Sequence, residues 1–456
     1  MDCIAANRQG WASRLLPGRT SARHPGSRGV LIIVENMPVP TDRRVWQEAT
    51  ALRQAGYHVS VVCPKGKGCE RAFERIDGIN IYRHWLPTDR PGTVSYLLEY
   101  AAALFWEFIL SLRVAWRHGF DVIHACNPPD LIFLVAIFHK IFFGKAFLFD
   151  QHDVVPELYE VKFARRNFIH RLLVLFERWT FRWADGSLAT NSRLKELAVA
   201  RGGMPEDKVW VVRTVPDLER IRQVKPDPSV RRTFRYLVGY VGFIAEQDGV
   251  HLLIEAMAYI IKGLGRLDVG CLVIGDGPQV TRLKALVDER GITDNIEFAG
   301  YISGDAVIAK LGACDIGIVP DPPNACNGMM SMIKVFEYMA LGLPIVQFDL
   351  MQAKNDAGAA AWAVVDPTPH SLGEAIVSLL EDGAARERMR GYGRERAHRE
   401  FQWATEKHSL LAAYATLAPI QDDDKNQSAG TPGEQPPSVL ESELDSTGVS
   451  RINCSH

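Results

Sequence analysis

The sequence predicts an α/β protein with two doubly wound parallel sheets, arranged as two Rossmann-like domains that face each other across a cleft. Short apolar runs of strand length alternate with helical segments, which is typical of such sheets. This alternation pauses over residues 213–234, where Pro and charged residues concentrate, and then starts again. The 456 residues also exceed what one ordinary core accommodates, so two domains are expected.

The first half supplies a complete set of alternating elements. Its apolar runs end in polar residues, as the strands of a buried parallel sheet do. The expected strands cover 29–35, 58–66, 77–85, 120–127, 146–153 and 186–192, and the expected helices cover about 42–56, 94–117 and 166–184.

The second half repeats the pattern and ends in a long helical segment, about 385–416, which we expect to cross back onto the first half. The expected strands lie within 236–244, 268–278, 296–302, 314–323 and 343–350, and a helix covers 249–262. The predicted organisation is an N-terminal domain (29–212), a linker (213–234), a C-terminal domain (235–400), the crossing helix (401–418) and disordered ends (1–28 and 419–456).

Composition excludes several classes of function. The formal charge of −2 gives no reason to expect a nucleic-acid partner. Eight scattered cysteines without a CxxC pair predict a reducing cytoplasm and no structural metal. No stretch has 18 uncharged apolar residues, so no spanning helix is expected. The first strand lacks a GxGxxG exit, and no P-loop motif occurs.

Ligands of doubly wound sheets bind at the carboxyl ends of the strands, so the strand exits are the candidate sites. Two exits carry unusual chemistry. "DQHDVVPELY" places His152, Asp153 and Glu157 after one strand, and "SMIKVFEYMALGLPIV" places Lys334 and Glu337 in an apolar helix. Each has a structural alternative: a buried HD pair, or an i,i+3 ion pair on a solvated helix face.

Several segments form a collinear set of motifs. They are "YVGFIAEQDGVHLLIEA" (240–256), "LVIGDGP" (272–278), "IEFAGYI" (296–302), "CDIGIVP" (314–320) and "FEYMALGLPIV" (336–346), preceded by "RRVWQEATALRQAGYHVSVVCPKG" (43–66), "FDVIHACNPPD" (120–130) and "FDQHDVVPELYE" (149–160). Together they resemble the retaining glycosyltransferases of family 4, and within them a bacterial subgroup that acts in surface-polysaccharide assembly. The resemblance covers about residues 29–416 in order.

The resemblance implies the GT-B architecture, with a nucleotide-sugar donor of UDP or GDP type on the C-terminal domain and a lipid-linked saccharide acceptor on the N-terminal domain. It implies transfer with retention, in which the leaving phosphate accepts the acceptor's proton. It implies no resident cofactor. Because no DxD motif stands at a strand end of either domain, no metal is expected.

Glu337 matches the second glutamate of the family's E-x7-E motif, which accepts hydrogen bonds from the ribose. The first glutamate is replaced by Met329, and the family's phosphate-binding Arg and Lys correspond to Phe243 and Asp248. We expect Lys334 to bind the diphosphate instead, since it stands in the first turn of a helix whose free N–H groups favour an anion.

The remaining expected donor-site residues surround this helix and the "IGDGP" turn. Gly275 and Gly277 equally suit a plain strand-to-helix turn. The predicted nucleotide-sugar site comprises Gly242, Gly275, Asp276, Gly277, Asn327, Ser331, Lys334 and Glu337.

His152 aligns with a family histidine that contacts the donor sugar, so His152, Asp153 and Lys334 are the predicted catalytic residues. Asp153 and Glu157 could orient this imidazole or bind acceptor hydroxyls, and they are the nearest carboxylates for a general base. The predicted acceptor-side residues are Arg43, Arg44, Asn127 and Glu157.

The segment 163–183 combines arginines with aromatic residues, a pattern of helices that lie in a membrane interface. The alternative is a core stripe with a solvated basic face. A lipid-linked acceptor favours the membrane, so a cytoplasmic protein at the inner face of the cell membrane is predicted. Because Met329, Phe243 and Asp248 depart from the family, a catalytically silent nucleotide-sugar-binding subunit and a nucleotide-sugar epimerase remain alternatives.

Overall fold

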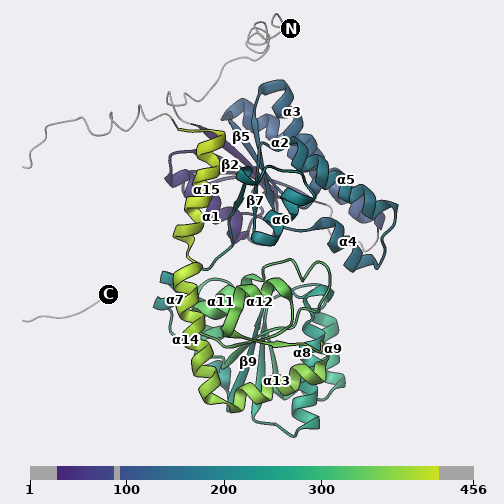
Figure 1. Cartoon of the computed structure of the whole chain (residues 1–456), viewed down its shortest axis with the longest axis vertical. Helices are drawn as coiled ribbons and strands as arrows, with labels where there is room; N and C mark the ends of the chain where they lie inside the picture. The colour runs from purple at the N-terminus through teal and green to yellow at the C-terminus, as the bar shows by residue number, and fades with distance from the viewer. Residues whose placement is uncertain (1–27, 87–92, 421–456) are drawn as a thin grey trace, which may run out of the picture. The chain divides into compact units, whose positions relative to one another are not determined.

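A computed structural model describes residues 28–86 and 93–420 of the chain, and side chains over 28–86 and 99–420. The terminal segments that the sequence predicts to be disordered lie outside this range except for Arg28, Pro419 and Ile420. The described chain forms two sheets covered by helices on both faces (Figure 1). This confirms the predicted fold class.

The first sheet has the strand order β3-β4-β2-β1-β5-β6-β7-β8. All its pairs are parallel except that of β3 with β4, where an edge strand absent from the prediction runs antiparallel. The strands are β1 (Gly29–Ile33), β2 (His58–Pro64), β3 (Phe73–Ile76), β4 (Ile79–His84), β5 (Val122–Cys126), β6 (Ala146–Gln151), β7 (Gly186–Ala189) and β8 (Val209–Val211).

Side-chain alternation along β1 divides the core of this sheet. Val30 and Ile32 face a cluster that includes α1 and α15, whereas Leu31 and Ile33 face a cluster that includes α2, α3, α5 and α6. The helices of this half are α1 (Arg43–Gln54), α2 (Thr93–Arg117), α3 (Phe133–Phe143), α4 (Val155–Phe163), α5 (Phe168–Trp183), α6 (Ser192–Ala200) and, within the predicted linker, α7 (Leu218–Gln223).

The second sheet is parallel throughout, with the order β11-β10-β9-β12-β13-β14. Its strands are β9 (Tyr236–Val241), β10 (Val269–Ile274), β11 (Ile296–Gly300), β12 (Ile316–Val319), β13 (Ile345–Phe348) and β14 (Ala361–Val364). Its helices are α8 (Val250–Ala258), which continues as a π-helical turn over Tyr259–Gly263, α9 (Val280–Glu289), α10 (Asp305–Gly312), α11 (Ile333–Leu341), α12 (Met351–Ala357), α13 (Pro369–Glu381) and α14 (Gly383–Glu400).

The single helix predicted over about 385–416 is wrong. It is two helices, α14 and α15 (Trp403–Leu417), separated by Phe401 and Gln402. The break turns Phe401 into the core of the second sheet, where its ring lies 4.7 Å from that of Phe336. Helix α15 then packs on the first sheet, through Leu410, Ala413 and Tyr414 (Figure 1).

Replacement of Phe401 by Ala should destabilise the protein by about 3–5 kcal/mol, because it leaves a cavity where α14 meets α15. Thermal unfolding followed by circular dichroism measures this loss. The control is Val365→Ala, since Val365 is 80% exposed. Equal melting temperatures for the two variants would contradict the structural role of the break.

Candidate functional site

The order of strands places one switch point in each sheet, and the candidate residues follow the strands at these points. In the first sheet β1 lies between β2 and β5, and in the second sheet β9 lies between β10 and β12. Parallel sheets open a crevice at the carboxyl ends of such strands. One candidate group, with His152, follows the strands of the first sheet, and the other, with Lys334 and Glu337, follows those of the second.

His152 lies directly after β6 and is held by a carboxylate on that strand. Its Nε2 atom lies 2.6 Å from Oδ2 of Asp150, and 14% of its side chain is exposed. Burial lowers the pKa of His152, but the Asp150 carboxylate raises it above its ordinary value. A carboxylate at Nε2 favours the tautomer with its proton there, which leaves Nδ1 as the proton acceptor.

Arg44 was predicted on the acceptor side, and the structure instead buries its guanidinium beneath the histidine. Its Nε and Nη2 atoms donate to the two carboxylate oxygens of Asp150 at 2.9 and 2.6 Å, and Nη1 donates to the carbonyl of Val212 at 2.6 Å. Only 6% of the residue is exposed. Arg44 therefore organises the site from within and is not available to bind a saccharide.

Asn127 follows β5 and fixes the backbone that carries the predicted catalytic pair. Its side-chain oxygen accepts the backbone N–H groups of His152 and Asp153 at 2.7 and 3.1 Å. Its amide nitrogen donates to Asp130 Oδ1 and to the carbonyl of Asp153. The side chain is buried and both its polar groups are used, so Asn127 shapes the loop of His152. Burial also raises the pKa of Asp153.

Glu157 lies in the first turn of α4 and forms an ion pair with Arg201. The same guanidinium also pairs with Glu177, whose pKa is raised by burial. The predicted acceptor-side role of Glu157 thus competes with a structural one, since its carboxylate already has a cationic partner.

Two glycines of the second sheet permit a close approach of neighbouring loops. A Cβ atom on Gly275 would lie 1.9 Å from the carbonyl oxygen of Gly242, and one on Gly277 would lie 2.4 Å from that of Ile244. Ile244 N donates to the Asp276 carbonyl at 3.0 Å, and the Asp276 side chain accepts from Gly277 N. These residues therefore join the exits of β9 and β10 whether or not a ligand binds.

Lys334 lies at the start of α11 and is paired with an acid that the sequence reasoning missed. Its Nζ atom lies 2.7 Å from Oδ2 of Asp321, after β12, and 4.9 Å from the ring centre of Tyr240. Asp248 faces the same ammonium. Burial raises the pKa of Asp248 to about 6, although Lys334 lowers it. Two carboxylates therefore face the ammonium group that is predicted to bind the diphosphate.

Glu337 forms its ion pair with Arg43, and Lys334 pairs with Asp321. The alternative i,i+3 ion pair between Lys334 and Glu337 is therefore not formed. Nη1 of Arg43 lies 2.5 Å from Oε1 of Glu337, and 61% of the arginine side chain is exposed. Arg43 was predicted on the acceptor side, but its guanidinium reaches the carboxylate predicted to hold the ribose. An exposed cation thus contacts the carboxylate that is predicted to bind the ribose.

The loop before α11 uses its polar groups internally. Asn327 donates to the carbonyls of Gln247 and Pro322, and Ser331 accepts from Gln352 at 3.4 Å. Met329 and Met330 pack against the apolar cluster of the first sheet, which contains Val154. The methionine at the family's glutamate position therefore has a packing partner.

One group of described residues has three potential metal ligands within 4.8 Å of one another: His124, Cys126 and Asp150. Arg44 already binds both oxygens of Asp150, and a fixed guanidinium beside that carboxylate opposes a second cation. We therefore interpret this group as a hydrogen-bonding network.

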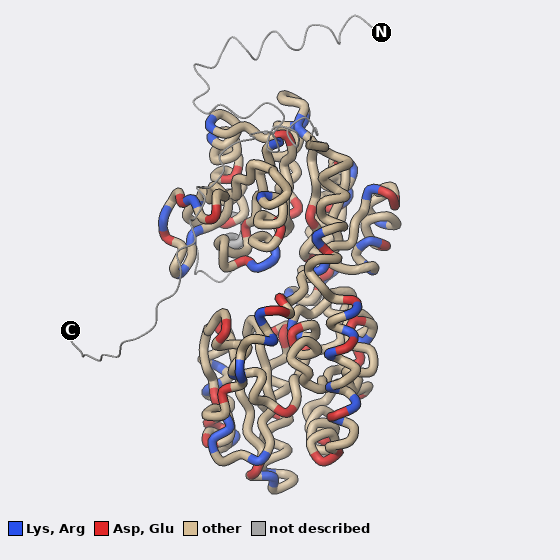
Figure 2. Tube along the Cα trace, turned by 90° about the vertical axis from the view of Figure 1, so that its left-hand side faces the viewer, with Lys and Arg blue, Asp and Glu red and all other residues tan. Residues whose placement is uncertain are grey.

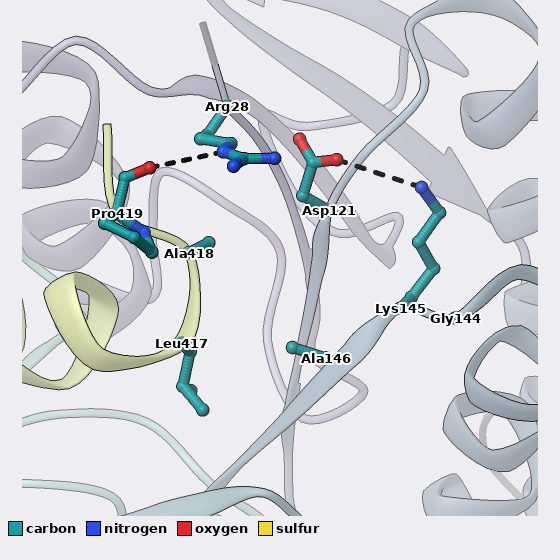
Figure 3. Close-up of a pocket in the computed structure, with 8 residues that line it drawn as sticks. All are labelled: Arg28, Asp121, Gly144, Lys145, Ala146, Leu417, Ala418 and Pro419. Carbon is teal, nitrogen blue, oxygen red and sulfur yellow. Dashed lines mark hydrogen bonds and ion pairs between the residues drawn. The ribbon is translucent and has the colours of Figure 1, made fainter. Parts of the chain in front are cut away.

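A separate hollow lies away from the carboxyl edge. It is lined by Arg28, Asp121, Lys145 and the end of α15, and these stand where β1, β5 and β6 begin (Figure 3). Arg28 donates to the carbonyl of Pro419 at 3.2 Å, and Lys145 lies 3.8 Å from Asp121. These contacts tie the end of α15 to the first sheet.

The chain matches two family models in succession. Residues 41–220 match "Glycosyltransferase Family 4" and residues 235–382 match "Glycosyl transferases group 1". These ranges contain the residues of the two candidate groups. Helices α14 and α15 lie outside them.

Two curated relatives show the kind of protein that the chain resembles. It is 29% identical over 187 residues to the 2-deoxystreptamine glucosyltransferase of Streptomyces kanamyceticus. The matched region covers 39% of this chain and 46% of that relative. It is 28% identical over 182 residues to the putative colanic acid biosynthesis glycosyltransferase WcaL of Escherichia coli, which covers 39% and 44%. The chain thus spans less than half the length of these relatives.

Among solved structures, this chain is similar to the crystal structure of Anabaena Alr3699/HepE in complex with UDP-glucose, with a TM-score of 0.63 and 15% identity. The matched region covers 85% of this chain and 99% of the Anabaena chain. Identity this low shows a shared fold. The likeness agrees with the predicted GT-B architecture.

The pKa of Asp248, about 6, predicts that the affinity of the group around Lys334 for a diphosphate anion depends on pH. Below that pH the carboxyl is neutral and no longer repels a diphosphate, so affinity should rise between about pH 7.5 and about pH 5.5. Calorimetric titration measures this change. Asp248→Asn should bind tightly at both pH values, and an unaltered pH dependence in this variant would contradict the assignment.

Proposed function

Because this chain belongs to the family 4 glycosyltransferases, as two family models matched in succession show, we propose that it transfers a sugar from a nucleotide diphosphate to a saccharide acceptor with retention of configuration. One observation carries the proposal: Glu337, Arg43 and the uncapped start of α11 meet at the switch point of the second sheet. Met332 at the helix N-cap offers no side-chain acceptor, so backbone N–H groups are left for an anion.

The donor fits this group by charge. The ribose hydroxyls donate to Glu337 and displace Arg43, whose exposed guanidinium then lies beside a diphosphate. Lys334 adds a second cation when it exchanges Asp321 for a phosphate oxygen. The bond between the anomeric carbon and the phosphate oxygen breaks while the acceptor oxygen bonds the same face, and the acceptor's proton passes to the leaving phosphate. In this proposal His152, which follows β6 of the first sheet, contacts the sugar.

A lipid-linked acceptor is supported by the surface of the first sheet. Large apolar side chains are exposed on neighbouring helices, among them Trp106 on α2, Phe142 on α3, and Phe168 and Trp179 on α5. Helix α3 contacts both α2 and α5, so these side chains stand on adjacent helices. Helix α5 also carries Arg171, Arg178 and Arg182. Together they suit the headgroup region of an anionic leaflet.

No helix in the described part of the chain has the length and apolar content to cross a bilayer. In the view of Figure 2, positions of both charge signs are interspersed along the described chain. We therefore assign membrane contact to these helices alone, with a bacterial surface polysaccharide as the product class. The relative named for colanic acid biosynthesis supports that class.

Incubation of the protein with UDP and GDP sugars and undecaprenyl-linked saccharides should yield an extended saccharide and free nucleotide diphosphate, detected by mass spectrometry. Glu337→Gln should lower kcat/KM by about tenfold or more, because an amide places a donor where the ribose needs an acceptor. Tight UDP binding without any transfer would instead favour a silent binding subunit, which Met329 and the Lys334–Asp321 pair motivate.

Lys334→Ala should weaken binding of UDP by about tenfold, because a charge-assisted hydrogen bond to phosphate is lost. The matched variant Asp321→Asn releases the ammonium and should bind UDP at least as tightly as the natural chain. Calorimetry measures both. If neither variant changes the affinity, Lys334 serves only as the partner of Asp321.

Phe168→Glu together with Trp179→Glu should abolish sedimentation of the protein with vesicles of phosphatidylglycerol and phosphatidylethanolamine, because charged side chains resist burial among acyl chains. The control is Leu267→Glu, an exposed site (70%) before β10 of the second sheet. Equal loss in both proteins would contradict a surface specific to α2, α3 and α5.

A further inference from the structure

Helix α15, the last in the described part of the chain, brings a tyrosine into the interior of the first sheet. Tyr414 of α15 is fully buried, and its hydroxyl lies 2.8 Å from Nδ1 of His124 on β5. Tyr57 packs beside it, with the two ring centres 5.4 Å apart, but the Tyr57 hydroxyl donates to the carbonyl of Ala418 instead. The two tyrosines therefore share a packing environment and differ in what their hydroxyls bind.

His124 connects Tyr414 to the carboxylate that holds His152. Nε2 of His124 lies 3.4 Å from Oδ2 of Asp150 and 3.7 Å from Oε2 of Glu48. Two carboxyl groups at Nε2 favour the tautomer with the proton on that atom. Nδ1 is then an acceptor, so the Tyr414 hydroxyl is the donor that fixes this tautomer.

Three of these side chains contact the same oxygen of Asp150. Oδ2 faces His152 Nε2 at 2.6 Å, Arg44 Nε at 2.9 Å and His124 Nε2 at 3.4 Å, while Oδ1 is held by Arg44 Nη2. The carboxylate is fully buried, and a low dielectric strengthens each of these contacts. The orientation of the His152 ring thus depends on a carboxylate that α1, β5 and, through His124, α15 keep in place.

We propose that Asp150 is the positioning residue of His152, and that Tyr414, acting through His124, makes the last helix part of the transfer site. The proposal rests on the proposed function for its catalytic meaning. Asp150 keeps the His152 proton on Nε2 and directs the lone pair of Nδ1 to the exposed side. Loss of Tyr414's hydroxyl removes the contact that holds the His124 ring against Asp150, and Asp150 then has one donor fewer to share its charge.

The groups that face His152 come from several elements. Asp150 lies on β6, Asp153 follows it, and α1 contributes Arg44, Glu48 and its N-cap Asp42. Burial raises the pKa of Glu48 to about 7, against the opposing effect of Arg44. Asp150 and Arg44 both contact the imidazole, at 2.6 and 3.1 Å, and of the two it is Asp150 that also contacts His124, the partner of Tyr414 on α15.

The test compares Tyr414→Phe with Tyr57→Phe in full-length protein whose histidines carry a 13C label. NMR titration follows the His152 ring, which is assigned by its absence in His152→Gln. With Tyr414→Phe, the His152 pKa should rise, because Asp150 has lost a competing donor. With Tyr57→Phe, it should stay as in the natural chain. If the two variants titrate alike, α15 only packs and the proposal for Tyr414 is wrong.

Asp150→Asn should shift the His152 pKa in the opposite direction. The pKa should fall, since an amide does not stabilise the imidazolium as a carboxylate does. Where transfer is measurable, kcat should fall about tenfold in Asp150→Asn and about threefold in Tyr414→Phe, with KM little changed. An unchanged His152 titration in Asp150→Asn would overturn the positioning role. The titration needs neither a sugar donor nor a saccharide acceptor. Absence of transfer would therefore refute the proposed function, whereas this inference is tested by the His152 titration alone.

Discussion

The ion pair between Arg44 and Asp150 is the interaction on which the first candidate group depends. Burial of two charges is unfavourable unless geometry and further hydrogen bonds compensate, and both conditions hold here. The guanidinium meets both carboxylate oxygens and also donates to the Val212 carbonyl. This pair ties α1 to β6 and to the end of β8, so the position of His152 is set by the fold and not by a flexible loop.

The second sheet has a related arrangement with a different balance of charge. Lys334 faces Asp321 and Asp248, and Glu337 faces Arg43. Each of these charges thus has a partner within the described chain. In the proposed function a diphosphate exchanges these partners, so its binding is a competition between internal and external anions. The departures from the family at Phe243, Asp248 and Met329 are consistent with a site that uses different cations and more apolar packing.

The strand periodicity and the collinear motifs determined the fold class, because a parallel sheet buried on both faces needs continuous apolar runs and helical crossovers. Local signals failed where tertiary packing decides. The edge strand β3 and the short β14 carry polar or exposed residues, and the single helix expected over 385–416 breaks so that Phe401 enters the core. No sequence pattern distinguishes that break from a continuing helix.

The sequence by itself determined which strand exits carry candidate residues, among them His152, Lys334 and Glu337. Only the tertiary structure decided their partners: Asp150 and Arg44 for His152, Asp321 for Lys334, and Arg43 for Glu337. Three of these pairs join residues from 13 to 294 positions apart. The physical reason is that ion pairing depends on separation in space, whereas a sequence motif records only separation along the chain.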